Sequence, residues 1–179
     1  AMILPNGPPA LGQTVAERMR TKVQIRPVNA APRMDVAAIR ARMGAAETGF
    51  GLRTGQEEHL RFGPRWRVLS SRAFGQGEAL ADLALPAEFA AEVGQGWLIH
   101  PALMDIATGW AMELIAGYRP SHLWVPVAYA RLRLWRPLPA RLVSHVRNAG
   151  ANRAEGPVAR FDVTLATPEG EVCAEISGF

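Results

Sequence analysis

The stretch His100-Pro-Ala-Leu-Met-Asp-Ile-Ala-Thr-Gly-Trp110 carries the strongest helical pattern in this 179-residue chain. Pro101 suits the first helical position, where a backbone N–H would lack a partner in any case. Apolar residues then recur at helical spacing: Leu103, Ala107, Trp110 and Leu114. Gly117 would end the helix. Because polar residues are few on every side, we expect this helix to be buried on most of its faces.

Strand patterns lie on both sides of the helix. Residues 67–74 and 78–85 flank the turn Gly75-Gln76-Gly77 and predict a hairpin. Period-two patterns predict further strands in residues 124–135, 141–148, 158–167 and 172–176. A buried helix among about five or six antiparallel strands predicts an α+β hot-dog fold, a long central helix wrapped by an antiparallel sheet.

The chain is long enough to form one domain with a substantial core. Residues 1–13 contain three prolines and two glycines and read as a lead-in, and residues 14–28 alternate as in a short strand. Asp35 can cap a short helix at residues 36–43. We therefore predict a lead-in and linker with a short helix in residues 1–48, followed by the hot-dog domain in residues 49–179.

The basic charge is spread along the chain. The net charge is +4 and the pI about 10.2, but all basic residues except Lys22 are arginines without one dense cluster. This argues against nucleic-acid binding, which needs a basic patch on one face. An acidic protein partner or a phosphate-bearing thioester arm would also suit a basic surface.

The chain carries no pattern that predicts a membrane span or secretion. No apolar run approaches the roughly 20 residues that cross a bilayer. Residues 1–9 lack the basic start and apolar stretch of a signal peptide. The single cysteine, Cys173, allows no internal disulfide. We expect a cytoplasmic protein.

Asp105 is the leading candidate for catalysis. It lies between apolar neighbours on a helix that we expect to be buried. Burial disfavours the charged form of a carboxyl group, while the nearby helix N-terminus favours it. A carboxyl group that stays protonated near neutrality is a general acid. The alternative is an aspartate that bonds backbone amides near the helix start and has only a structural role.

The other polar candidates carry weaker signals. His100 is expected to order the helix start by hydrogen bonding rather than to catalyse. None of the four histidines shows metal-ligand spacing, so we predict no metal site. The chain lacks a G-x-S-x-G elbow and the Lys-Ser/Thr of a phosphate loop. The five tryptophans, Trp66 among them, are assigned mainly to the core, with a groove for an apolar chain as the alternative.

Several phrases resemble, in order, the dehydratase domains of modular type I polyketide synthases. His100-Pro-Ala-Leu-Met-Asp105 resembles the family's H-P-x-L-L-D motif, and Phe62-Gly63-Pro64-Arg65-Trp66 resembles its Y-G-P-x-F. Residues 79–86, 125–139 and 161–172 resemble strands and loops that accompany these motifs. The resemblance covers roughly residues 22–179.

The resemblance implies a specific reaction and partners. Such domains are double hot dogs that remove water from a β-hydroxyacyl chain on the phosphopantetheine arm of an acyl carrier protein. A histidine of the first hot dog takes the α-proton, and the aspartate of the second, here Asp105, protonates the departing hydroxyl. The chemistry needs no metal or redox cofactor. Neighbouring synthase domains are implied as partners, and a homodimer stays open.

Three departures from the family pattern matter. The H-x-x-x-G-x-x-x-x-P motif of the catalytic histidine is absent, so the chain resembles the second hot dog with the linker before it, and the N-terminal half supplies the base. Gln or His usually follows the aspartate by four residues, and here that residue is Gly109. Phe62 replaces the tyrosine. His100, Pro101, Phe62, Gly63, Pro64 and Gly109 are thus expected to support or line the site.

Other functions remain open on the same residues. Gly109 and Phe62 suit a related double-bond isomerase or a cyclase. A non-catalytic structural or carrier-docking module is a second alternative. A self-sufficient single hot-dog thioesterase is less favoured, because it would need its own base or nucleophile.

Overall fold

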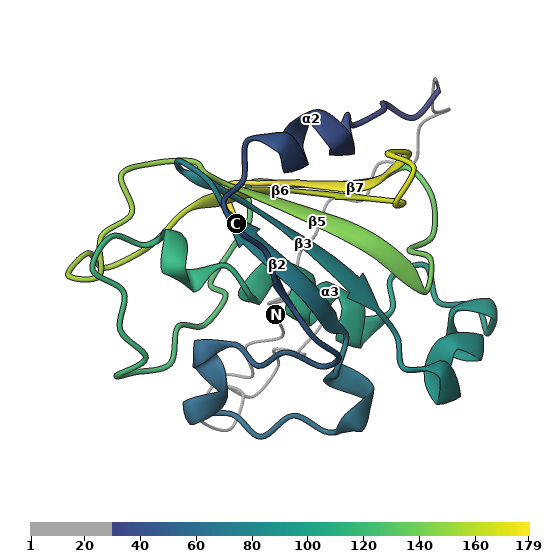
Figure 1. Cartoon of the computed structure of the whole chain (residues 1–179), viewed down its shortest axis with the longest axis horizontal. Helices are drawn as coiled ribbons and strands as arrows, with labels where there is room; N and C mark the ends of the chain where they lie inside the picture. The colour runs from purple at the N-terminus through teal and green to yellow at the C-terminus, as the bar shows by residue number, and fades with distance from the viewer. Residues whose placement is uncertain (1–29) are drawn as a thin grey trace, which may run out of the picture. The chain divides into compact units, whose positions relative to one another are not determined.

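The computed structural model describes residues 30–179, of which Ala31–Phe179 form one compact unit (Figure 1). The alternation predicted in residues 14–28 lies outside the described residues. Seven antiparallel strands form one sheet in the order β1-β2-β3-β5-β6-β7-β4. The strands are β1 (Glu47–Thr48), β2 (Leu69–Phe74), β3 (Glu78–Ala84), β4 (Arg131–Leu134), β5 (Arg141–Asn148), β6 (Phe161–Ala166) and β7 (Val172–Ser177).

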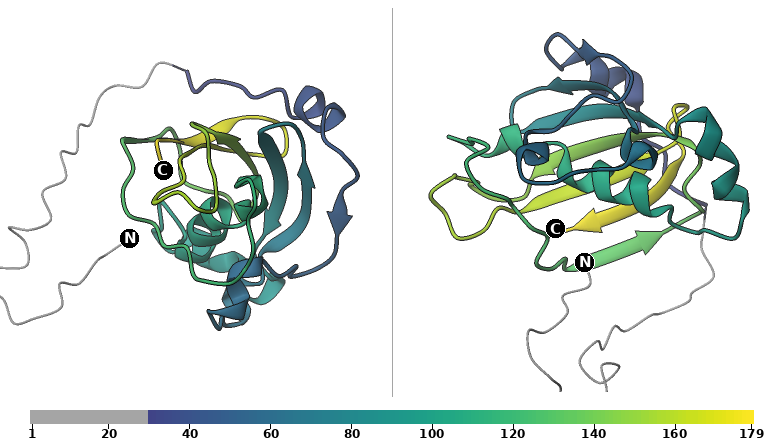
Figure 2. Two further views of the ribbon diagram at one scale, coloured as in Figure 1. Left: turned by 90° about the vertical axis from the view of Figure 1, so that its left-hand side faces the viewer. Right: turned by 90° about the horizontal axis from the view of Figure 1, so that it is seen from below.

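Short helices complete the described part of the chain. They are α2 (Val36–Ala41), α3 (Pro101–Gly109) and the 3₁₀ segments η1 (Gly55–Glu58), η2 (Pro64–Trp66), η3 (Ala87–Gly94) and η4 (Met112–Leu114). Seen end-on, the sheet curls around α3 on its inner face (Figure 2). This arrangement confirms the predicted hot-dog fold.

The predicted β2–β3 hairpin is confirmed. Gly75 N–H donates to the carbonyl of Glu78 at 2.8 Å, and Gly77 has a φ of 70°, a left-handed conformation that favours glycine. From this hairpin the sheet continues directly into β5, because residues 78–84 pair with residues 141–147. The chain between β3 and β5 contains α3, so this pairing closes the sheet over the helix.

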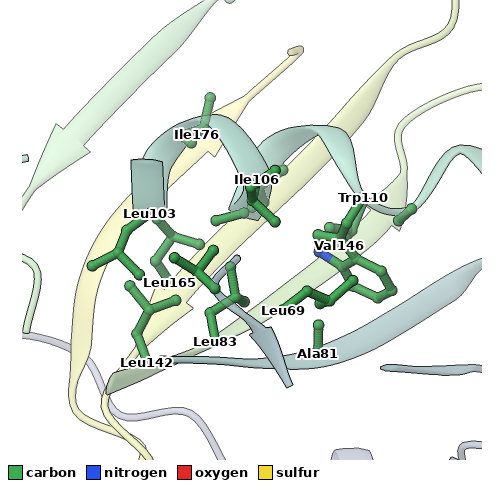
Figure 3. Packing of buried hydrophobic residues seen from close by; sticks show 14 of the residues in the cluster. Leu69, Ala81, Leu83, Leu103, Ile106, Trp110, Leu142, Val146, Leu165 and Ile176 are labelled. Carbon is green, nitrogen blue, oxygen red and sulfur yellow. The ribbon is translucent and has the colours of Figure 1, made fainter. Parts of the chain in front are cut away.

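Helix α3 buries one face against the sheet (Figure 3). The side chains on this face are Ala102, Leu103, Ile106, Ala107 and Trp110, all at most 4% exposed. The Trp110 indole N–H donates to Ser144 Oγ of β5 at 3.1 Å, and that hydroxyl donates to the Ala107 carbonyl at 2.7 Å. Every polar group at this contact therefore has a partner, as burial requires.

The predicted end of α3 at Gly117 is wrong, because the helix ends at Gly109. Glycine costs about 1 kcal/mol relative to alanine inside a helix, and β-branched Thr108 precedes it. The Thr108 hydroxyl also donates to the carbonyls of Met104 and Asp105, a local bond that competes with helix continuation. The chain then forms η4, and Gly117 turns it with a φ of 79°.

The expectation that α3 is buried on most sides is confirmed, because Ala102, Leu103, Ile106, Ala107 and Thr108 are buried. The exception is one narrow side of the helix, on which Pro101 and Asp105 are exposed one turn apart. The apolar residues around Asp105 thus belong to a helix that is covered on most sides, and the side that carries the carboxylate is left open.

The strand predicted at residues 124–135 is much shorter, since only residues 131–134 form β4. Strand β4 pairs with β7, in which Ser177 is the last residue and faces Arg131. Residues before 131 extend past the end of β7 and therefore have no strand to pair with. Pro126 also lacks the N–H that a ladder needs.

Helix α2 packs on the opposite face of the sheet from α3 (Figure 1). Asp35 caps it as predicted, its carboxylate accepting from Ala38 N–H at 2.9 Å. Ile39 contacts Leu80 and Val143. Residues 31–48 of the predicted linker thus pack on the sheet, and their linker role stays a prediction.

Replacing Leu103 with alanine should destabilise the fold strongly. Leu103 is 0% exposed, and loss of a buried leucine side chain leaves a cavity that costs about 2–5 kcal/mol. Leu98→Ala is the matched control, because Leu98 is 60% exposed and its loss should change the free energy of unfolding by less than about 0.5 kcal/mol. Urea denaturation of both variants measures the difference. Equal midpoints would contradict the packing of α3 on the sheet.

Glu78, Arg42 and His145 form a charged cluster on the face of the sheet that α2 covers, and this cluster predicts that the fold loses stability in acid. Arg42 and then His145 hydrogen-bond Glu78 and lower its pKa from 4.5 to about 2. The unfolded chain therefore binds a proton more readily, and this contribution disappears as the pH falls from about 4.5 toward 2. Burial lowers the pKa of His145, so acid weakens the fold there too. Thermal denaturation should show a flatter pH dependence below pH 4.5 for Glu78→Gln; an unchanged slope would contradict the assignment.

Candidate active site

A cavity of about 420 Å³ lies beside the open face of α3. Its wall is mostly apolar and includes Leu60, Phe62, Ile106, Met112, Phe161 and Phe179. Asp105 and Arg160 are the charged residues that line it. The cavity therefore offers an apolar groove with one carboxylate.

One wall of the cavity is the extended segment 123–128, which has no strand partner. Gln56 of η1 holds this segment in place. Its side-chain N–H donates to the Trp124 carbonyl at 3.0 Å, and its side-chain oxygen accepts from Trp124 N–H at 3.3 Å. The buried amide thus replaces the ladder that the segment lacks.

Asp105 lies at the cavity wall with its side chain exposed. Its Oδ2 accepts a hydrogen bond from Trp66 Nε1–H at 2.8 Å. The prediction that this carboxylate is buried is wrong, because Asp105 is exposed in this structure. The reason is its place on α3, opposite the face that Leu103 and Ile106 present to the sheet.

The Phe62–Trp66 phrase lies next to Asp105. Phe62 lines the cavity, and its ring is stacked on that of Trp66 with centroids 6.4 Å apart and planes at 3°. Gly63 and Pro64 are exposed and start η2, in which Trp66 N–H donates to the Gly63 carbonyl at 3.0 Å. Gly63 and Pro64 thus shape the turn that presents Trp66.

His100 does not line the cavity. It is the residue that precedes α3, and it bonds η3. Its ring is 1% exposed, and Nε2 lies 3.0 Å from Glu92 Oε2. Glu92 also accepts from the Arg65 guanidinium at 2.8–3.0 Å. The hydrogen bonds of Arg65 and then His100 lower the pKa of Glu92, which keeps it charged near neutrality. The ring therefore bonds a side chain of η3 and not the backbone of α3.

Gly109 lies one turn beyond Asp105 and lines the cavity. A Cβ at this position would meet no atom within 4 Å. The space for a larger side chain is therefore present, and glycine leaves it open beside the carboxylate.

Sequence reasoning missed Trp66, Arg65 and Glu92 as site residues. Trp66 packs against the core, as the sequence predicts for most of the tryptophans, but its indole also bonds a residue 39 positions away. Glu92 joins Arg65 to His100 across three separate segments. No spacing rule could pair these residues, because their contact depends on how η2 and η3 fold against α3.

The remaining histidines do not line the cavity. His59 Nε2 is 2.9 Å from the Pro120 carbonyl, His122 is 3.0 Å from Ser121 Oγ, and His145 bonds Glu78 on the other face of the sheet. Within residues 30–179, no histidine lines the cavity. An acid at this wall therefore has no histidine base beside it in the described part of the chain.

Two further observations concern the described residues only. No group of three or more His, Cys, Asp or Glu side chains there could hold a metal ion. None of their helices combines the length and hydropathy of a membrane span.

A family of known proteins matches most of the chain. The sequence model described as "Polyketide synthase dehydratase N-terminal domain" matches residues 53–179. The chain is 27% identical over 124 residues to polyketide synthase PksM of Bacillus subtilis (strain 168), a match that covers 66% of this chain and 3% of PksM. It is 26% identical over 119 residues to PksN of the same strain, covering 66% of this chain and 2% of PksN.

Solved dehydratase structures share the fold. A trans-AT polyketide synthase dehydratase domain from Brevibacillus brevis superposes with a TM-score of 0.74 at 24% identity, covering 87% of this chain and 54% of that chain. The CurK dehydratase, as a mutant with Asn in place of Asp that is described as inactive, gives a TM-score of 0.67 at 21% identity, covering 84% and 52%. A second inactive CurK mutant has Phe in place of His, with a TM-score of 0.63 at 20% identity and coverage of 83% and 51%. The chain thus spans about half the length of these structures.

Proposed function

The chain belongs to the polyketide synthase dehydratase family, and we propose that it supplies the acid-bearing half of a dehydratase site in which Asp105 is the general acid. The observation that carries the proposal is the exposed carboxylate of Asp105 at the wall of a largely apolar cavity. A general acid must reach the leaving group, and a carboxylate open to the cavity can do so.

The proposed reaction removes water from a β-hydroxyacyl thioester. A histidine outside the described residues takes the α-proton, and the electrons of that C–H bond form the double bond. The β C–O bond breaks, and Asp105 gives its proton to the departing hydroxyl, so that water leaves. The proton taken by the histidine then returns to the carboxylate through solvent. These steps need no metal or redox cofactor.

The cavity supports an acyl chain as substrate. Apolar residues from η4, β6 and the C-terminus, including Met112, Phe161 and Phe179, form much of its wall. Burying an alkyl chain there is favourable by about 25 cal/mol per Å² of apolar surface. Arg160 is exposed and lines the same cavity, where its charge could pair with the phosphate of a phosphopantetheine arm.

We propose that this chain is the second of two hot dogs, with the catalytic histidine in the first. The support is the His100-to-Asp105 motif, the lack of a histidine at the described cavity wall, and coverage of about half of each solved dehydratase. The matching sequence model is described as the N-terminal domain, which makes the order testable. A histidine-bearing hot dog encoded directly upstream would support the proposal, and one encoded directly downstream would overturn this order.

The proposed partners follow from the reaction. They are an acyl carrier protein, the histidine-bearing hot dog and neighbouring synthase domains, in a cytoplasmic assembly. A homodimer of this protein also remains open.

A related isomerase or cyclase is the second candidate. Gly109 presents no side chain to the cavity, and Phe62 lines it without a hydroxyl group. Both features reduce the number of polar groups that hold a substrate oxygen. Assays of double-bond migration and of ring closure on the same carrier-bound substrates separate these activities from dehydration. A non-catalytic docking module would show none of the three.

Asp105→Asn should nearly abolish dehydration while leaving the fold intact. The amide cannot supply the proton, and loss of general acid catalysis typically costs about 10²- to 10⁴-fold in rate. The assay follows loss of water from a β-hydroxyacyl group on acyl carrier protein by mass spectrometry, in the protein with its upstream segment. Asp35→Asn is the matched control, because Asp35 caps α2 on the other face of the sheet and asparagine caps equally well.

This assay distinguishes whether Asp105 is the acid and where the base lies. Unchanged turnover in Asp105→Asn would remove Asp105 from the mechanism. Turnover by residues 1–179 alone would mean that the chain contains its own base. Turnover only with the upstream segment would support a site shared between two hot dogs.

A further inference from the structure

The hydrogen bond between Trp66 and Asp105 stands out among the contacts of the cavity wall. Asp105 has Pro101, Ala102, Thr108 and Gly109 as neighbours one turn away on α3. Proline, alanine and glycine have no side-chain donor, and the Thr108 hydroxyl is bonded to the carbonyls of Met104 and Asp105. Within the described residues, the indole of Trp66 is the one hydrogen-bond donor to the carboxylate.

We infer that Trp66 is the positioning residue of Asp105, and that it holds Oδ2 so that the transferable proton resides on Oδ1. The inference deepens the proposed function and rests on it. An indole N–H can only donate, so Oδ2 must accept. When the carboxyl group is protonated, its proton therefore goes to Oδ1, which has no partner among the described residues. Oδ1 is then the atom that protonates the leaving hydroxyl.

Trp66 is held firmly enough to orient the carboxylate. Its ring stacks on Phe62, and its backbone N–H donates to the Gly63 carbonyl. The adjacent Arg65 reaches Glu92, which in turn bonds His100 at the start of α3. The short segment η2 is thus tied to α3 at two points, one through Trp66 and one through Arg65. A donor fixed by such packing keeps its direction during the reaction.

This role also explains how Asp105 can have a hydrogen-bond donor although residue 109 is glycine. The open space beside Gly109 would admit a side chain reaching Asp105 from one turn away on α3. In this chain the donor comes instead from η2. The two positions therefore offer alternative donors to one carboxylate, and a donor restored at residue 109 should replace one lost at residue 66.

The test compares two tryptophan-to-phenylalanine variants in the protein with its upstream segment. Trp66→Phe should lower kcat for dehydration by about a hundred-fold, with little change in KM, because a misplaced acid affects the reaction more than substrate binding. Trp135→Phe is the matched control. It removes an equivalent bond, from the Trp135 indole to Glu175 Oε2 at 3.1 Å, away from the cavity wall. Equal kcat in the two variants would overturn the inference.

Rescue separates positioning from structural damage. Adding Gly109→Gln to Trp66→Phe should recover at least about ten-fold of the lost kcat, since the amide can donate to Asp105 from the next turn. A loss that Gly109→Gln fails to restore, together with a lowered melting temperature, would also count against the inference.

A measurement without turnover tests the hydrogen bond itself. The chain has five tryptophans, so a ¹⁵N–¹H spectrum shows five indole signals, and Trp66→Phe assigns one of them. Asp105→Asn should move that signal upfield, because a neutral amide oxygen accepts more weakly than a carboxylate, and should leave the Trp135 signal in place. An unmoved Trp66 signal would overturn the inference while leaving the proposed function intact. If instead Asp105→Asn retains turnover, the proposed function fails whatever the spectrum shows.

Discussion

The structure depends on the packing of one face of α3 against the curved sheet. Leu103, Ile106 and Trp110 pack between the helix and the sheet (Figure 3), and the buried Trp110 indole donates to the buried Ser144 of β5. Because this face is committed to the core, the rotation of the helix about its axis is determined. That rotation sends Asp105 to the opposite side, where the cavity lies. The position of the proposed acid is thus a consequence of how the core packs.

The remainder of the site is built from segments that have no regular ladder. Segment 123–128 extends past the end of β7 and is held by Gln56, and η2 is held to α3 through Trp66 and Arg65. Such segments can vary without disturbing the sheet. The hydrogen-bond donor to Asp105 comes from such a segment, the indole of Trp66 in η2, while residue 109 of α3 is a glycine and has no side-chain donor.

Much of the fold followed from short-range patterns. The β2–β3 hairpin, β5 and the cap of α2 at Asp35 were predicted correctly, since turn glycines, period-two alternation and capping residues act over a few positions. The end of α3 and the length of β4 were not. Helix α3 stops at Gly109, where the Thr108 hydroxyl competes for backbone carbonyls. Strand β4 begins only at Arg131, opposite Ser177, the last residue of β7. Neither limit appears in the periodicity of residues 101–117 or 124–135.

The sequence by itself determined the fold class, the family and the choice of Asp105, because the ordered motifs around residues 62–66 and 100–105 are local in the chain. The tertiary structure decided which side of α3 stays open, that Asp105 is exposed there, and that Trp66 is its donor. These features join residues as far as 39 positions apart through one hydrogen bond. A linear pattern contains the residues, but only the packing of α3, η2 and the sheet gives the distances between their atoms.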